Sequence, residues 1–254
     1  FYYFEVYFGE ESQSRREVFH LTGLSPASRF HTKSFDELRE EDKRRFKIAV
    51  LRSIVVQQLL PDDDTSKYHI FERLNRGGTS LTNQEVRNSV YHGKFVAFLT
   101  NLNKVPEWRK LLGKDEPDSR QKDIELLIRF FAMRDRKAYQ KPMKDFLTTF
   151  MRKNRNPPQE SLARVEEVFR KTCKGLLDAL PPKPFHVRAG LNVAVADAVM
   201  VAFSNHLDAV PTDIKDRYEK LKADAKFDDN TKQGTTDEET VKARFERAES
   251  VLFG

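Results

Sequence analysis

The sequence contains a single cysteine, Cys173, and no hydrophobic run long enough to cross a membrane. One thiol cannot form an internal disulfide, and it cannot supply the set of thiolates that a structural zinc site needs. A transmembrane helix needs about 20 consecutive apolar residues. These absences predict a soluble protein of the cytoplasm, with no membrane among its partners.

A large excess of charge of one sign is also missing. The 45 Lys and Arg residues exceed the 39 Asp and Glu residues only slightly, which gives a net charge of +6. This charge permits nucleic-acid binding without requiring it. Hydrophobic residues make up 39% of the chain and include 20 Phe, a composition too apolar for a disordered protein. We therefore expect a globular protein with a substantial core.

The N-terminal part of the sequence combines helical and strand-like patterns. Residues 1–8 begin without Met and are predicted to be the end of an amphipathic helix, so we expect the chain to be the later part of a longer protein. Residues 17–22 have a short β-like pattern. Apolar residues alternate over residues 46–57, as they do in a half-buried strand.

Helical signals dominate the rest of the chain. Ser34 and Glu37 fit a capping box that would start a helix through about residue 45, and Thr82 and Glu85 fit a second box. Periodic apolar residues predict further helices. These helices are expected over residues 67–74, 83–91, 94–103, 107–112, 119–134, 140–153, 159–179, 190–206, 211–225 and 237–252.

Together these patterns predict a mainly helical chain with two parts. Residues 1–92 would complete a small α/β domain, and residues 93–254 would form a helical domain. Residues 226–236 are polar and are expected to be mobile. No internal repeat divides the chain further.

The most informative segment is residues 70–88, IFERLNRGGTSLTNQEVRN, which has the pattern of a helix, a Gly-Gly turn and a capped helix. Two adjacent glycines allow positive φ and a close approach of the backbone to a ligand. The first amides of the following helix can receive an anion such as phosphate. The residues expected to bind a nucleotide or phosphate there are Arg73, Asn75, Gly77, Gly78, Arg87 and Asn88.

A purely structural explanation of this segment stays open. The two glycines lack the Lys-Ser/Thr pair of a Walker phosphate-binding loop. The same residues would also suit a tight corner between helices, in which glycines make the turn and Glu–Arg pairs orient the helices.

Two basic stretches are candidates for contact with DNA phosphates, although such runs are more often solvated faces. They contribute the candidate DNA-binding residues Lys43, Arg44, Arg45, Arg152, Lys153 and Arg155. The six histidines are scattered, and none has the spacing of a metal site, so no bound metal is expected.

Residues 70–88 resemble the signature of the domain family that opens GmrSD-type restriction endonucleases and related phage-defence proteins. Further similarity lies at Trp108 and Arg109, over residues 123–132, and over residues 197–200. The resemblance implies a ParB-like α/β N-terminal domain followed by a helical region. It also implies a protein that acts in DNA restriction.

The hallmark of that family is an Asp-Gly-Gln-Gln-Arg motif, which is associated with nucleotide binding and hydrolysis. The chain lacks it, since Gln57 and Gln58 have neither the Asp-Gly nor the Arg beside them. The resemblance therefore implies a sensor or regulatory domain of a nucleotide-dependent restriction protein, inactive and without a cofactor by itself. A nucleoside triphosphate would bind the intact protein, where the hydrolase activity would reside.

The expected partners are DNA and either the missing N-terminal segment or another protein chain. The alternative function is a non-enzymatic helical module that binds DNA or a protein partner. Absence of the hydrolytic motif favours this alternative for the chain taken alone.

Arg73 offers a test of the phosphate-binding hypothesis. In the full-length parent, Arg73→Ala is expected to weaken nucleotide or DNA binding about ten- to hundredfold, because a charge-assisted hydrogen bond contributes roughly 1.5–3 kcal/mol. The melting temperature should change little, since an exposed ion pair contributes only about 0–1 kcal/mol. Unchanged binding by the folded variant, or a lower melting temperature at constant affinity, would contradict the hypothesis.

Overall fold

The computed structural model describes residues 20–50, 68, 70, 73, 81–188 and 190–254. These residues are mainly helical, as predicted, and contain no β-strand. Their contacts divide the chain into two compact units, residues 1–57 and residues 58–254. The boundary expected between residues 92 and 93 is a different division, and it stays a prediction.

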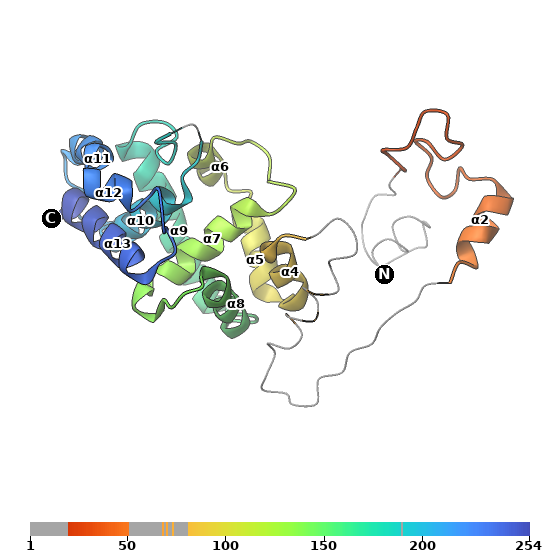
Figure 1. The fold of residues 1–254 in the computed structure, drawn as a ribbon, viewed down its shortest axis with the longest axis horizontal. Helices are drawn as coiled ribbons and strands as arrows, with labels where there is room; N and C mark the ends of the chain where they lie inside the picture. Colours follow the sequence, from red (N-terminus) through yellow and green to blue (C-terminus); the bar gives the residue numbers. More distant parts are fainter. Residues whose placement is uncertain (1–19, 51–67, 69, 71–72, 74–80, 189) are drawn as a thin grey trace. The chain divides into compact units, whose positions relative to one another are not determined.

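The described residues form the helices shown in Figure 1. They are α2 (Glu40–Lys47), α4 (Asn83–Val90), α5 (Lys94–Leu102), α6 (Pro106–Leu112), α7 (Lys122–Met133), the 3-10 helix η2 (Arg136–Ala138), α8 (Met143–Lys153), α9 (Gln159–Ala179), α10 (Val193–Asn205), α11 (Ile214–Ala223), α12 (Ala225–Asp229) and α13 (Glu238–Phe253). Tyr68, Ile70 and Arg73 are also helical.

The first unit differs from the expected α/β domain. The sequence predicts a strand over residues 46–57. Among its described residues this prediction is wrong, because residues 46 and 47 are the end of α2 and residues 48–50 form no strand. Residues 51–57 lie outside the described residues. A ParB-like α/β domain is therefore not supported.

The strand expected over residues 17–22 is also wrong in its described part. Leu21 exchanges two backbone hydrogen bonds with the segment opposite: its N–H donates to the Lys33 carbonyl, and the Thr32 N–H donates to its carbonyl, each at 2.9 Å. Thr32 has a φ of 58°, a left-handed conformation that ends extended pairing. The pairing thus stops at one residue and forms no strand.

The helix predicted to start at Ser34 begins later. Glu37 does accept hydrogen bonds from the Ser34 backbone N–H (2.7 Å) and hydroxyl (3.0 Å). However, the residues that follow form a turn, in which Phe35 and Leu38 pack in a small core of their own. The helix starts at Glu40, so the local cap forms without propagating the helix.

The second capping box is confirmed. The Glu85 N–H donates to Thr82 Oγ1 (3.2 Å), and the Thr82 N–H donates to Glu85 Oε2 (2.6 Å), which fixes the start of α4. Helix α4 then buries Val86 and packs against α7 and α8. The helices predicted beyond it are present, with some starts up to three residues later than expected.

Helix α10 lies at the centre of the second unit, where it contacts α7, α9 and α13. Its sequence, VAVADAVMVAFSN, is apolar on every side, which is the pattern of a helix enclosed by others. Asp197 is its one charged residue and is 2% exposed. The partner of this buried carboxylate is therefore a central feature of the fold.

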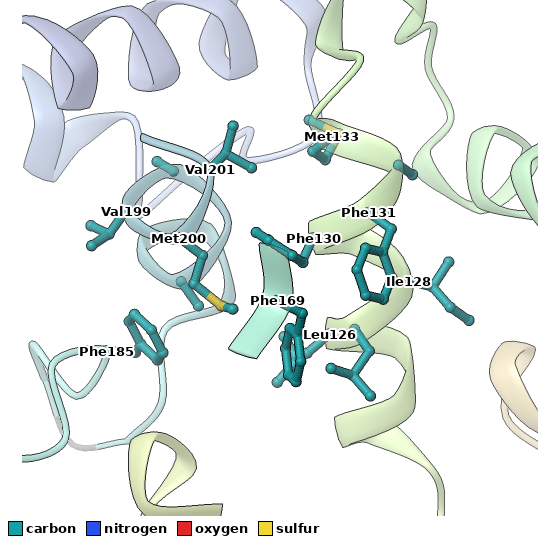
Figure 2. Packing of buried hydrophobic residues seen from close by; sticks show 14 of the residues in the cluster. Leu126, Ile128, Phe130, Phe131, Met133, Phe169, Phe185, Val199, Met200 and Val201 are labelled. Atoms are coloured by element: carbon teal, nitrogen blue, oxygen red, sulfur yellow. The ribbon is translucent and has the colours of Figure 1, made fainter. Parts of the chain in front are cut away.

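Aromatic side chains fill the space between α7, α9 and α10. Figure 2 shows Phe130 and Phe131 of α7 beside Phe169 of α9, with Met200 of α10 facing them. The three phenylalanine rings have centroids 5.1–5.9 Å apart and are tilted against one another, a favourable geometry for aromatic contacts. Cys173 is fully buried in the same core.

The polar segment 226–236 is more ordered than expected. It includes most of α12, whose first turn is capped by Asp224: the Phe227 N–H donates to Asp224 Oδ1 at 2.8 Å. Phe227 is 2% exposed and joins the main core. Arg244 of α13 also donates to the Asn230 and Thr235 carbonyls, so contacts with other elements hold a segment whose composition suggests mobility.

The start of α5 is held by residues that follow α8. The Lys94 N–H donates to Asn156 Oδ1 (3.1 Å), and the Phe95 N–H donates to the Arg155 carbonyl (3.2 Å). Gly93 lies directly against these acceptors: a Cβ at this position would be 2.7 Å from both Arg155 O and Asn156 Oδ1. The close contact therefore requires glycine.

This contact predicts that Gly93→Ala lowers the free energy of unfolding by about 1–3 kcal/mol, because the added methyl group overpacks the corner. Gly190→Ala is the matched control, since a Cβ there would have no atom within 4 Å. The control should stay within about 0.5 kcal/mol of the parent in urea titrations. Equal effects of the two substitutions would refute the role of Gly93.

Candidate functional site

In the QEVRN part of the informative segment, Gln84, Arg87 and Asn88 lie on one face of α4, and this face packs on the start of α7. Arg87 is 1% exposed. Its Nη2 donates to Glu125 Oε2 of α7 at 2.5 Å, and its Nε donates to Gln84 Oε1 at 2.9 Å. Burial lowers the pKa of the Arg87 guanidinium, and the Glu125 carboxylate opposes that shift. Arg87 thus ties α4 to α7.

Asn88 extends the same network. Its Nδ2 donates to Gln121 Oε1 at 2.5 Å, while its Oδ1 accepts from Gln84 Nε2 at 2.7 Å. Gln121 has a φ of 58°, so the chain cannot be helical there and α7 starts one residue later. The start of α7, predicted at residue 119, is therefore delayed by this turn.

A second buried network fixes the loop before α7. Arg109 donates from Nη1 to Asp123 Oδ2 (2.8 Å) and from Nε to the Lys114 carbonyl (3.0 Å). Asp123 Oδ2 also accepts the Asp118 N–H at 2.8 Å. The loop that carries Arg120 is therefore held at both of its ends.

A pocket of about 520 Å³ opens between the start of α4 and the first half of α7. Its apolar lining comes from Leu81, Leu126 and Val193. Its polar lining comes from Thr82, Asn83, Gln84, Arg120, Lys122, Glu125 and Arg129. The pocket thus adjoins the end of the informative segment and has the size of a small-molecule site.

The charged side chains that line this pocket differ in their ionic contacts. Glu125 is bound by Arg87, and Arg120 lies 3.4 Å from Glu85. Lys122 is exposed. By helix geometry, the N–H of Asn83 and that of its neighbour Gln84 have no acceptor within α4. Cationic side chains beside the first amides of a helix suit an anionic group such as phosphate.

Arg129 forms the inner wall of the pocket and reaches into the core. It is 7% exposed, and its Nε donates to both oxygens of Asp197 at 3.0 and 3.1 Å, with a further bond from Nη2. Burial alone would lower the pKa of Arg129, but the Asp197 carboxylate raises it above the ordinary value. Arg129 is thus a permanent, oriented cation.

Several residues expected from the sequence have a different place. Arg73 has a helical backbone and is exposed, whereas Asn75, Gly77 and Gly78 lie outside the described residues. Arg87 and Asn88 point to α7, behind the pocket, rather than into its lining. The phosphate-binding role of these residues stays a prediction.

The first basic stretch forms part of α2. Lys43 pairs with Glu40 at 2.9 Å, and Arg45 lies 3.6 Å from Glu41, while Arg44 is exposed. Two of its three cations therefore have acidic neighbours on the same helix.

The second stretch closes the corner at α5. Arg155 donates from Nε to the His92 carbonyl at 2.9 Å, whereas Lys153 is exposed and Arg152 half-buried. DNA contact by either stretch stays a prediction.

Sequence reasoning missed Arg120, Lys122 and the inward position of Arg129 as pocket residues. Arg129 lies within the stretch 123–132 that carries the family resemblance, but that stretch does not show which side chain lines a pocket. Among the described residues, no group of three or more His, Cys, Asp or Glu side chains could hold a metal ion. No helix in the described ranges is long and apolar enough to span a bilayer.

Comparison of this chain with protein-family models, curated proteins and solved structures finds no match.

The buried pair between α7 and α10 predicts a large stability effect. Asp197→Asn should lower the free energy of unfolding by about 3–5 kcal/mol, because Arg129 would then be a buried cation without a counter-ion. Replacing both residues, as in Arg129→Met with Asp197→Leu, should restore much of the loss. Asp208→Asn, at an exposed residue, is the control for chemical denaturation. A single variant no less stable than the control would contradict this assignment.

Proposed function

We propose that this chain is the sensor or regulatory part of a nucleotide-dependent DNA-restriction protein of the GmrSD-related phage-defence family. In this proposal, the pocket at the start of α4 receives a phosphate group of a nucleotide or of DNA. The protein would act in the cytoplasm, with DNA as a partner.

The observation that carries the proposal is the composition of the pocket. Arg120, Lys122 and Arg129 bring three cations to one cavity, and Glu125, its one acidic residue, is already paired with Arg87. Arg120 also lies 3.4 Å from Glu85, and Arg129 is paired with Asp197. With Arg87 included, four cations and three carboxylates leave one positive charge in excess next to the first amides of α4. Cations beside a helix N-terminus form a favourable site for phosphate.

The position of the pocket in the sequence supports the same conclusion. Residues 81–84 contribute four of its lining residues, and in the sequence only Thr79 and Ser80 separate them from the Gly-Gly pair of the family resemblance. The resemblance at residues 123–132 covers three more, Glu125, Leu126 and Arg129. Two segments that are separate in the sequence therefore meet at one cavity.

The experiment compares a double variant of the pocket, Arg120→Gln/Lys122→Gln, with a control double variant on α11, Lys215→Gln/Lys220→Gln. Both control residues are exposed. Binding of fluorescent GTP, ATP and a short DNA duplex is measured by anisotropy as salt is varied. The pocket variant should bind its ligand at least about tenfold more weakly, since each charge-assisted contact contributes roughly 1.5–3 kcal/mol. For a duplex, the salt dependence should also become less steep.

The control pair should bind as the parent does, because it removes the same charge elsewhere. Equal loss in both variants would show a non-specific charge effect. Binding that is unchanged in the pocket variant would reject the pocket as the phosphate site.

A second candidate function is a non-enzymatic module that binds a protein partner. It is favoured by apolar side chains exposed at and after the end of α2: Phe46 is 49% exposed, Ile48 71% and Val50 89%. Exposed apolar groups of this size are typical of interaction surfaces when they lie together. If the chain is such a module, the double variant Arg120→Gln/Lys122→Gln should not change the affinity for nucleotide or DNA. Ile48→Lys should then abolish the contact with the protein partner.

A further inference from the structure

We propose that a second pocket, between η2 and α13, binds a small ligand through a phosphate or carboxylate group. This pocket has a volume of about 430 Å³. Arg136, Lys137 and Tyr139 line it from one side, and Val241 and Lys242 of α13 line it from the other. None of these residues lines the pocket at the start of α4.

Three cations reach this pocket from two elements. Lys137 and Lys242 are exposed, so their ammonium groups are free to turn toward a ligand. The Arg136 guanidinium lies 5.8 Å from the centroid of the Phe245 ring, which holds it against α13. The cavity therefore has one oriented cation and two adaptable ones.

Two carboxylates, Glu238 and Glu246, also line the cavity. Glu238 is engaged, since its Oε1 accepts the backbone N–H of Lys141 at 3.0 Å. Three cations and two carboxylates leave one positive charge in excess at the pocket wall.

A buried cation behind the wall adds to this excess. Arg244 is fully buried, and its Nη1 donates to the carbonyls of Asn230 and Thr235, each at 3.1 Å. Its Nε and Nη2 have no hydrogen-bond partner among the described residues. The nearby Asp197 is bound through both oxygens by Arg129, so one carboxylate serves two buried guanidinium groups.

Arg244 lies close to the pocket because the same loop holds it and Tyr139. The Tyr139 hydroxyl donates to the Thr236 carbonyl at 2.5 Å, next to the Thr235 carbonyl that Arg244 binds. On α13, Arg244 is also one turn from Val241, which lines the pocket and is 2% exposed. A charge buried at this depth is weakly screened by solvent, so it attracts an anion in the cavity.

The shape of the cavity suits a small organic anion. The Tyr139 ring and Val241 give the inner wall an apolar part, while the cations lie toward the opening, where they are more exposed. Small-molecule sites combine an apolar lining with a few polar groups that fix orientation in this way.

The test uses inorganic phosphate and citrate as probes. Their binding to the whole chain is measured by titration calorimetry and by the shift in its melting temperature. We expect saturable binding of at least one probe, which sodium chloride of equal ionic strength does not reproduce. The double variant Arg136→Gln/Lys242→Gln should weaken that binding about tenfold or more. Preference for phosphate over citrate, or the reverse, identifies the group that the ligand carries.

Two control variants make the test specific. Lys215→Gln with Lys220→Gln removes the same charge from α11, and Arg120→Gln with Lys122→Gln removes it from the pocket at the start of α4. Both should keep the affinity of the parent for the probe. Absence of saturable binding, equal loss in the α11 control, or loss only in the Arg120 and Lys122 variant would overturn the proposal.

Discussion

The ion pair of Arg129 and Asp197 is the constraint on which the helical unit depends. Helix α10 is enclosed by its neighbours, so its carboxylate has no access to water and needs an ionic partner within the fold. Two-point binding by a planar guanidinium also restricts orientation, because both oxygens must be reached from one direction. The pair thus constrains how α7 is oriented against α10.

The same pair links the two pockets. Arg129 lines the cavity at the start of α4, and Arg244, which lies near Asp197, stands behind the cavity at α13. The buried cluster of Arg129, Arg244 and Asp197 carries more positive than negative charge. An anion bound in either cavity would therefore interact with charges that also determine how α7, α10 and α13 pack.

The sequence predicted most helices of the second unit, because their periodicity and caps are local. It failed where distant contacts decide. Ser34 and Thr82 begin the same capping signature, but the helix after Thr82 packs against α7, whereas the described residues after Ser34 form a turn that packs in a small local core. Arg87 looked like a ligand-binding residue for the same reason: its partner Glu125 is 38 residues away, and no local pattern indicates that contact.

The contact of Lys94 with Asn156 has a consequence for synthesis of the chain. The acceptor that completes the N-terminus of α5 lies 62 residues downstream of the amide it serves. On a ribosome, α5 emerges well before that acceptor exists, so its first turn depends on water for hydrogen bonding in the meantime. Helices α4 to α7 can then form early as separate segments, but their corner at Gly93 closes only after α8 has been made.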